Sequence, residues 1–377
     1  MAEWKEYELN QICSRLSSGK GLPAKKISDN GKYPVYGGNG LRGYTETANF
    51  EGDCAIIGRQ GAYCGNVRYF SGTAYMTEHA VVTCANEDNN TRYLSYLLST
   101  MNLGRLSGQS AQPGLSVKTL GKQIVKVPPL ATQNKVVSIL AALDTKIEDN
   151  EKINKNLEQQ AQAIFKSWFV DFEPFNGEMP FDWTVSKLGD IASIKTNSFS
   201  PVKNPDAQLE HYSIPAYDEQ KYPVFESAAG VKSNKYILSK NSVMISKLNP
   251  DTKRVWRPMC LSALAVSSTE FIIFEAFNPA YRDFVFSIID SAAFSDWMCA
   301  HTTGSTNSRQ RTTPSATLEF QVALPDEKTI TDFCAIVTPM YDAIAANICE
   351  NQRLAQLRDS ILPKLMSGEL DVSDINL

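Results

Sequence analysis

The chain has 377 residues, of which 43% are hydrophobic and 21% charged, and a formal net charge of −4 at pH 7. Two or three domains with ordinary cores fit this length, and the small negative charge argues against a general polyanion binder without excluding local basic faces. The eight cysteines form no CxxC pair and only three histidines are present, which excludes zinc-finger spacing and predicts reduced thiols. The sequence shows neither a signal peptide nor a long apolar run, so we expect a soluble, cytoplasmic protein without membrane contact.

The first block, residues 1–127, mixes short β-like runs with glycine-rich turns. The runs are YPVYGG, DCAIIG, NVRYF and EHAVVTC. The stretch 91–101 has one apolar face and predicts a helix, with Gly104 as its stop. A polar loop (103–116) and a short apolar strand, QIVKVPP, follow, so the block is of mixed α+β type.

The segment 128–175 predicts one long helix with a heptad seam, the pattern of a helix that lies against another helix. From Thr132 to Trp168 this helix would be roughly 55 Å long, so it needs a partner helix rather than a small domain to cover it. The seam residues are Val136, Leu140, Leu143, Ile147, Asn150, Asn154, Leu157, Ala161, Ile164 and Trp168.

A second block at 176–325 has its own β-like runs, a predicted helix over 284–298 and a polar loop over 301–314. The partner helix follows it, within 326–377. A constant offset of 197 carries the first seam onto Phe333, Val337, Met340, Ile344, Asn347, Asn351, Leu354, Arg358, Ile361 and Leu365. Antiparallel pairing would place Asn150 against Asn351 and Asn154 against Asn347, because a buried polar seam residue fixes register. Pro339 predicts a kink or a fresh helix start.

The two halves repeat one plan. Trp4, Leu9 and Ile12 return at an offset of 179 as Trp183, Leu188 and Ile191. Together with the matched helices, this predicts two tandem α+β blocks separated by two long helices that form an antiparallel coiled-coil spacer.

Several catalytic patterns fail on closer reading. The GxGxxG match at 38–43 lacks a following helical pattern, and no GxxxxGK[ST] is present. The run 249–252 lacks the second proline and the aromatic residue of the motif that amino-methyltransferases use, and is interpreted as a turn. His79, His211 and His301 have neither nucleophile nor metal-ligand spacing, so no catalytic residue and no metal site is predicted.

Several motifs resemble one family. They are YPVYGGNGLRGY (33–44), IIGRQGAYCGNV (56–67), PPLATQ (128–133), QAQAIFKSWFVDFEPF (160–175) and RDSILPKLMSGEL (358–370). Over nearly its whole length the chain resembles the DNA-specificity subunit of type I restriction-modification systems, usually called HsdS. The second copy of the helix entry, LPDEKT (324–329), departs from the pattern by lacking the second proline and the glutamine.

The resemblance implies that each block is a target recognition domain for one half of a split, asymmetric double-stranded DNA site. The spacer would set the gap and dock two methyltransferase subunits that bring S-adenosylmethionine and adenine-N6 chemistry. Motor-nuclease subunits using ATP and Mg would join for restriction, and the chain itself would be a non-catalytic subunit that binds no cofactor.

Candidate DNA contacts are basic and polar residues of the loops, since phosphates favour Lys and Arg, and base edges favour Arg, Asn, Gln, Ser and Thr. In block one they are Lys20, Lys25, Lys26, Asn39, Arg42, Tyr44, Arg59, Gln60, Arg105, Ser107 and Gln109. In block two they are Lys195, Asn197, Lys247, Asn249, Lys253, Arg254, Arg257, Ser305, Thr306, Asn307, Arg309 and Arg311.

The aromatic residues Phe165, Trp168, Phe169 and Phe172 have two interpretations, core packing or a docking patch for the methyltransferase subunit. Three other functions also stay open. These are an enzyme with its own site, a coiled-coil adaptor that ignores DNA, and a methylation-only or phage-defence subunit without a nuclease partner.

Overall fold

The computed structural model describes residues 3–107, 114–303, 310–372 and 375. The chain divides into two compact units, unit 1 (Met1–Ile147 with Arg353–Leu377) and unit 2 (Glu148–Gln352). Each unit therefore contains one of the two blocks and a part of both long helices.

Unit 1 is built on a six-stranded sheet with the order β2-β7-β5-β6-β3-β4. Its strands are β2 (Cys13–Ser18), β3 (Tyr33–Gly37), β4 (Gly40–Thr45), β5 (Phe50–Gly58), β6 (Val67–Met76) and β7 (Ala80–Ala85). The GxGxxG match falls on the β3–β4 hairpin, where Gly37 pairs with Gly40, and not on a strand-to-helix turn. Short helices η4 (Leu103–Leu106) and α2 (Val117–Gly121) follow.

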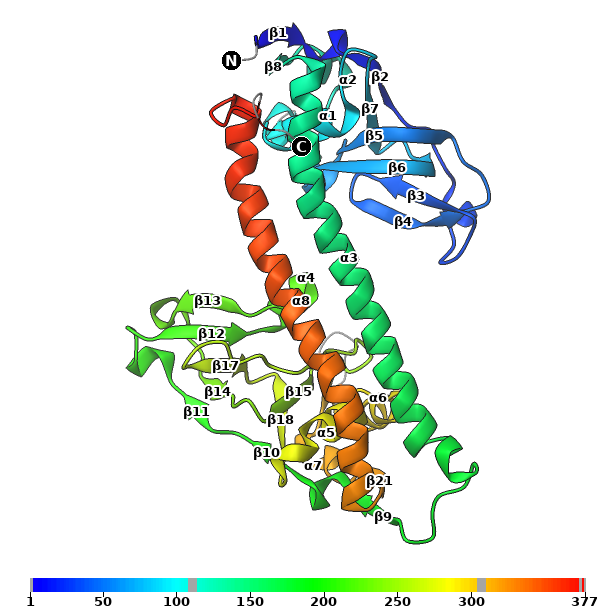
Figure 1. Ribbon diagram of the computed structural model, residues 1–377, viewed down its shortest axis with the longest axis vertical. Coiled ribbons are helices and arrows are strands. Elements are labelled where there is room, and N and C mark those ends of the chain that lie inside the picture. Colours follow the sequence, from blue (N-terminus) through cyan, green and yellow to red (C-terminus); the bar gives the residue numbers. More distant parts are fainter. Residues whose placement is uncertain (1–2, 108–113, 304–309, 373–374, 376–377) are drawn as a thin grey trace. The chain divides into compact units, whose positions relative to one another are not determined.

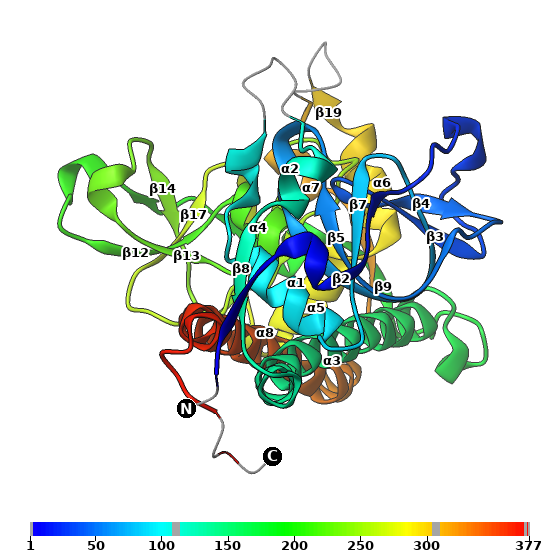
Figure 2. The same ribbon diagram turned by 90° about the horizontal axis from the view of Figure 1, so that it is seen from above.

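Helix α1 (Thr91–Ser99) lies between this sheet and the long helix α3 (Figures 1 and 2). Tyr93 and Leu94 are buried, and the Asn90 side chain caps the helix by accepting hydrogen bonds from the N–H groups of Arg92 and Tyr93. The helix ends at Ser99, so the predicted stop at Gly104 is wrong. Gly104 belongs to the separate helix η4.

Unit 2 has a four-stranded sheet, β10-β18-β15-β16, and a five-stranded sheet, β11-β14-β17-β12-β13. The first contains β10 (Ala192–Lys195), β15 (Ser242–Ser246), β16 (Val255–Trp256) and β18 (Phe271–Ala276). The second contains β11 (Ser198–Phe199), β12 (Gln208–Tyr212), β13 (Val224–Ser227), β14 (Lys235–Ile237) and β17 (Ala265–Ser268). Helix α4 (Ile214–Gln220), the strand pair β19 (Thr302–Thr303) and β20 (Arg311–Thr312), and helix α7 (Pro314–Thr317) complete it.

The single helix predicted over 284–298 is two helices, α5 (Arg282–Ile289) and α6 (Ala292–Ala300). The break lies at Asp290 and Ser291, where the Ser291 side chain accepts a hydrogen bond from the Phe294 N–H (3.1 Å) and caps α6. A serine that can cap a new helix competes with continuation of the old one.

The repeat is visible in the topology. In unit 1, β1 (Lys5–Glu8) pairs with β8 (Ile124–Val127), and in unit 2, β9 (Thr184–Lys187) pairs with β21 (Gln321–Leu324). Each pair leads directly into a long helix. The orders β2-β7-β5 and β10-β18-β15 also correspond, so both blocks share a common base and differ in the strands added to it.

The long helices are α3 (Leu130–Phe169) and α8 (Glu327–Ser367) (Figure 1). All twenty predicted seam residues are buried or half-buried. In unit 2, the Asn150 amide donates to Asn351 Oδ1 (2.8 Å) and the Asn347 amide donates to Asn154 Oδ1 (2.8 Å). These are the two pairs that antiparallel alignment of the seams predicts.

Helix α8 continues through Pro339, so the predicted fresh start is wrong. Proline removes the hydrogen bond to the carbonyl group four residues earlier. Ala335 and Pro339 are both exposed, and water can therefore satisfy the freed carbonyl group.

In unit 1 the block is attached to the helices by polar contacts around Asp144 of α3. The Tyr96 hydroxyl donates to Asp144, Arg358 Nη1 of α8 donates to it at 3.0 Å, and Arg92 Nη2 lies 3.6 Å away. Burial and the hydrogen bond to Asp144 both raise the pKa of Tyr96. Gln133, also buried, accepts from the Asn90 N–H and donates to Asn89 and to the Pro128 carbonyl oxygen.

All eight cysteines are free thiols, and burial raises the pKa of Cys13 and of Cys54 to about 12. Among the described residues, no helix combines the length and the apolar character needed to cross a membrane.

The Asn154–Asn347 pair predicts a non-additive stability effect. Asn154→Leu alone should lower the free energy of unfolding by about 1–3 kcal/mol, because the Asn347 amide loses its bond while still shielded from water. The double variant with Asn347→Leu should recover most of that loss, since both partners become apolar. Denaturant unfolding of Asn154→Leu, Asn347→Leu and the double variant measures this, and single variants as stable as the parent would contradict the buried pair.

Candidate nucleic-acid interface

In unit 1, one end of the six-stranded sheet gathers the loops that follow β3, β5 and β6. The Arg59 N–H donates to the His79 carbonyl oxygen (2.9 Å), and the Leu115 N–H donates to the Arg59 carbonyl oxygen (2.8 Å). Gly65, at φ +86°, approaches η4 so closely that a Cβ there would lie 2.2 Å from the Gly104 nitrogen. The loops 59–66 and 77–79 and helix η4 therefore form one continuous surface.

The polar side chains on this surface interact with one another. Gln60 Oε1 lies 2.9 Å from His79 Nδ1, and His79 Nε2 lies 3.3 Å from Glu78 Oε1. Arg59 Nη1 donates to the Glu78 carbonyl oxygen at 3.4 Å. These contacts restrict the rotamers of Arg59 and Gln60 while Gln60 stays exposed.

Most of the block-one candidates meet at this end of the sheet. Asn39 and Arg42 are exposed at the β3–β4 hairpin, Arg105 is exposed on η4, and Ser107 follows η4. Lys20 is attached nearby, because its N–H donates to the Met76 carbonyl oxygen (3.0 Å).

Two residues that the sequence reasoning missed also belong to this surface. The Arg68 guanidinium lies against the hairpin, 3.0 Å from where a Cβ on Gly40 would stand, and His79 holds Gln60. Arg68 lies in the middle of a predicted strand rather than in a polar loop, so the loop composition did not indicate a role for it at this surface.

Lys25, Lys26 and Tyr44 lie elsewhere. The two lysines are in η2 (Ala24–Lys26), and the adjoining Ser28 bridges to Tyr44 near the far end of β4. The structure therefore does not bring these three candidates to the loop end. Gln109 lies outside the described residues.

In unit 2, the segment 247–249 lies between the β17–β18 turn and β20. The Lys247 N–H donates to the Glu270 carbonyl oxygen (2.9 Å), and its carbonyl oxygen accepts from the Thr312 N–H (3.0 Å). Asn249, at φ +48°, donates its N–H to the Gln310 carbonyl oxygen (2.9 Å). Lys247, Asn249 and Arg311 are therefore brought together. Ser305, Thr306, Asn307 and Arg309 lie outside the described residues.

Three further candidates of unit 2 form ion pairs with acidic side chains of other elements, so their charges are partly neutralised within the protein. Arg254 forms a double hydrogen bond with Asp218 (2.6 and 2.9 Å), and Lys253 Nζ lies 2.6 Å from Asp290. Arg257 pairs with Asp283 (2.8 Å) and Asp342 (2.7 Å), and its side chain is only 10% exposed. The acidic partners are distant in sequence, so the basic run 253–257 by itself gave no sign of these pairs.

Lys195 and Asn197 lie apart from the 247–249 segment. Lys195 pairs with Ile273 at the edge strand β10. The Asn197 carbonyl oxygen accepts from the Ile237 N–H (2.8 Å) beside β14.

The aromatic residues Phe165, Trp168, Phe169 and Phe172 pack in the core of unit 2. Phe169 is 7% exposed, with its ring centroid 4.9 Å from Phe333 and 5.0 Å from Phe284. Phe172 packs on Trp183. All four side chains thus contribute to core packing, and Phe165, Trp168 and Phe172 stay half-buried at its border.

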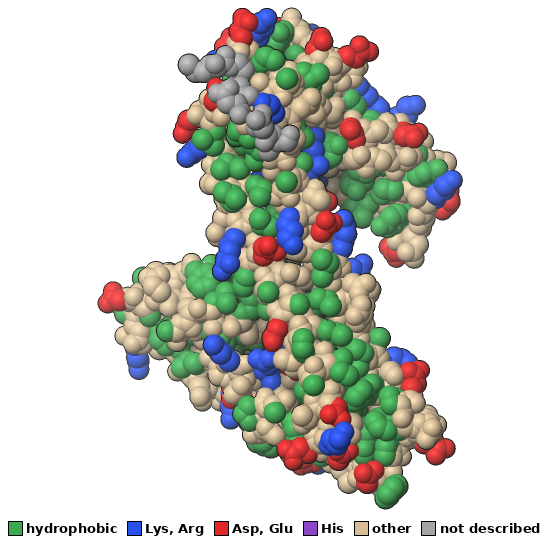
Figure 3. Space-filling view, viewed as in Figure 1, with side chains coloured by type: hydrophobic (Ala, Val, Ile, Leu, Met, Phe, Trp, Pro, Cys, Tyr) green, Lys and Arg blue, Asp and Glu red, His purple; other side chains and the backbone are tan. Residues whose placement is uncertain are grey.

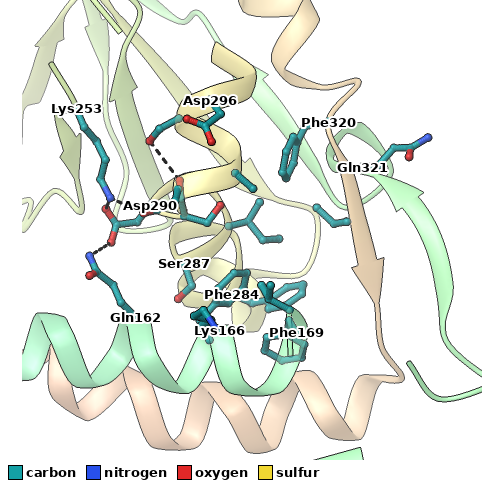
Figure 4. A pocket seen from close by; sticks show the side chains of 18 of the residues that line it. Gln162, Lys166, Phe169, Lys253, Phe284, Ser287, Asp290, Asp296, Phe320 and Gln321 are labelled. Atoms are coloured by element: carbon teal, nitrogen blue, oxygen red, sulfur yellow. Dashed lines mark hydrogen bonds and ion pairs between the residues drawn. The ribbon is translucent and has the colours of Figure 1, made fainter. Parts of the chain in front are cut away.

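One side of this core opens into a groove of about 960 Å³ (Figure 4). Phe165 and Phe169 of α3 and Phe284 of α5 line its apolar part. Asp290 lines its polar part, where Gln162 Nε2 donates to Asp290 (2.7 Å) and Lys253 pairs with the same carboxylate. Val170, at 53% exposure, is accessible beside Phe169.

The charges on the described surface are mixed. On the face drawn in Figure 3, Lys and Arg side chains lie among Asp and Glu side chains. No group of three or more His, Cys, Asp or Glu residues within the described ranges could hold a metal ion. His211 pairs with Glu226 (2.6 Å), and His301 stacks on Trp297 at 4.1 Å.

Part of the chain matches one protein family, and the chain is similar in sequence to several specificity subunits. Residues 1–159 match the family described as "Type I restriction modification DNA specificity domain". The EcoprrI specificity subunit of Escherichia coli is 37% identical over 147 residues, which cover 38% of this chain and 36% of that protein. The MjaIX specificity subunit of Methanocaldococcus jannaschii is 25% identical over 75% of this chain and 70% of its own length.

The fold is also known. A crystal structure of a type I restriction-modification S subunit from M. genitalium superposes with a TM-score of 0.64 at 14% identity, covering 97% of this chain and 96% of that one. Two α+β blocks with long helices are thus the architecture of that structure too.

The ion pairs of Arg257 predict a structural role. Arg257→Ala should lower the free energy of unfolding by about 1.5–3 kcal/mol, because Asp283 is 2% exposed and loses one of its two arginine partners. Arg105→Ala, at an exposed position of η4, should change it by no more than about 0.5 kcal/mol. Equal melting temperatures for these two variants would argue against the buried network.

Proposed function

We propose that this chain, a member of the type I restriction-modification DNA specificity family, reads a bipartite, asymmetric double-stranded DNA site, one half with each block. The observation that carries the proposal is the repetition of one β-sheet plan in two units, each presenting polar loops of different composition. Two different readers on one repeated scaffold suit two unequal half-sites.

The loop residues supply the chemistry of recognition. Arg42, Arg59 and Arg105 in unit 1 offer charge for phosphates, and Asn39 and Gln60 offer the paired donor and acceptor that suit an adenine edge. Gln60 is oriented by His79, which lowers the entropy lost when it binds a base. In unit 2 the structure brings together Lys247, whose charge suits a phosphate, with Asn249 and Arg311, whose paired hydrogen-bonding groups suit base edges.

The long helices serve as the spacer. A pair of helices held in one register by buried asparagines resists sliding, which is what a spacer of set length requires. A rigid link between two weak readers favours DNA that carries both half-sites at the matching gap.

Specificity subunits are non-catalytic components of type I restriction-modification systems, and the chemistry is therefore assigned to partners. We assign adenine-N6 methylation to two modification subunits that hold S-adenosylmethionine, and restriction to motor-nuclease subunits that use ATP and Mg. The cytoplasm, where the DNA is, is the expected location.

The test is to co-express the chain with the methyltransferase encoded beside it and to map N6-methyladenine across the host DNA. A split motif with a fixed gap is the expected result. A stable complex without methylation would favour a defence subunit with a non-modifying partner. If no complex forms and no DNA is retained, the adaptor function is favoured instead.

The spacer role predicts how the gap changes. Deletion of 147–153 together with 348–354 removes one heptad from each helix, and these segments are antiparallel partners in the asparagine register. The rod shortens by about 10 Å, so the gap should shrink by about three base pairs at ~3.4 Å each, with unchanged half-sites. The length-preserving change Ile147→Leu with Leu354→Ile is the control, and the same gap in the deletion variant would refute the spacer role.

The groove beside Phe169 is the proposed docking place for a modification subunit. Val170→Asp places a charge at its edge without removing core volume, since Val170 is 53% exposed. Copurification of the methyltransferase should fall at least tenfold, while Val185→Asp, on a 60% exposed valine of β9 outside the groove, should leave it unchanged. Equal copurification of both variants would place the docking surface elsewhere.

A further inference from the structure

Four described arginines of unit 2 bind a carboxylate side-on, through Nε and Nη2, and one of them differs from the rest. Arg254, Arg257 and Arg282 each make an additional contact, with the Thr252 carbonyl oxygen, Asp342 and the Lys240 carbonyl oxygen. Arg311 contacts Glu270 at 2.9 and 3.0 Å and has no further partner among the described residues. The side-chain exposures are 14% for Arg254, 10% for Arg257, 21% for Arg282 and 43% for Arg311.

The backbone of Arg311 is held from both sides. It bridges to Leu248 on one side and pairs with Thr303 on the other, where Thr303 Oγ1 donates to the Arg311 carbonyl oxygen (3.2 Å). The next residue, Thr312, donates its N–H to Lys247. The guanidinium therefore extends from a fixed point rather than from a freely moving loop.

Glu270 is equally well placed. Its carbonyl oxygen accepts from the Lys247 N–H, and its own N–H donates to Ser268 Oγ (3.3 Å). The hydrogen bond from Arg311, with the nearby Lys247 charge, holds the pKa of Glu270 below its usual value. The carboxylate is therefore ionised at neutral and mildly acidic pH, and it fixes the plane of the guanidinium.

A guanidinium has five N–H donors in one plane. Glu270 takes the Nε–H and one Nη2–H, which leaves the outer edge, with parallel donors on Nη1 and Nη2, turned away from the carboxylate. Two parallel donors match the O6 and N7 acceptors of guanine in the major groove. We propose that Arg311, positioned by Glu270, reads a guanine in the half-site of unit 2, an assignment that rests on the proposed function.

A phosphate would also accept two parallel hydrogen bonds. However, the Glu270 carboxylate lies within hydrogen-bond distance of the same guanidinium, so the pair is close to neutral and an approaching phosphate meets a negative charge. A base edge carries no net charge and does not meet this repulsion. The geometry therefore favours base readout.

The experiment uses the full chain, copurified with its modification subunit, to select from duplexes with randomised bases. Arg311→Lys keeps the charge but loses the planar fork, so it should reduce the preference for guanine at one position by about 5- to 140-fold. The other positions should keep their preferences. Glu270→Gln should weaken the same position while raising binding to all sequences, because a negative charge is lost.

Arg254→Lys is the matched control and should leave every base preference unchanged, since Arg254 is paired with Asp218 and largely buried. Thermal melts of all variants test folding. Unchanged base preferences in Arg311→Lys, or an equal loss over all sequences, would overturn the guanine assignment while leaving the proposed function intact. A wild-type complex that enriches no motif would overturn both.

Discussion

The hydrogen bonds between Asn150 and Asn351 and between Asn347 and Asn154 fix how the two long helices meet. The seam around them is largely apolar and would by itself tolerate sliding by a heptad. Such a slide would place amide groups against leucine and isoleucine, which costs about 1–3 kcal/mol for each polar group left unpaired. Two asparagines per helix therefore convert a general tendency to associate into a single register.

The two halves share a plan but attach their blocks to the helices by different chemistry. Asp144 and Gln133 make polar contacts with the block of unit 1. The residues at the same places in the second helix are Tyr341, which is 6% exposed and bonds to Ser287 (3.1 Å), and Ile330, which is 1% exposed. At these two places the first attachment is polar and the second is mainly apolar, while apolar residues of both long helices also pack against each block.

The periodicity of apolar residues in the sequence predicted the structural features that repeat at regular spacing. The seam, the asparagine pairs and the strands of both blocks follow from local patterns, because burial repeats with the period of a helix or a strand. The ion-pair partners of Arg254 and Arg257 cannot be predicted from local patterns, since Asp218, Asp283 and Asp342 come from other elements. The break between α5 and α6 depended on one capping serine within an otherwise helical pattern. For the candidate interface, the sequence identified polar loops, but only the fold separates exposed arginines such as Arg105 and Arg311 from largely buried ones such as Arg254 and Arg257.

The first and last strands of each block pair with one another over four residues, Lys5–Glu8 with Ile124–Val127 and Thr184–Lys187 with Gln321–Leu324. The chain therefore enters and leaves each block at one place, beside the start of a long helix. A block closed in this way behaves as a cassette, because its replacement by recombination requires no change in the helices as long as these four-residue ladders are kept. A single exchange can then replace one whole block while both long helices stay unchanged.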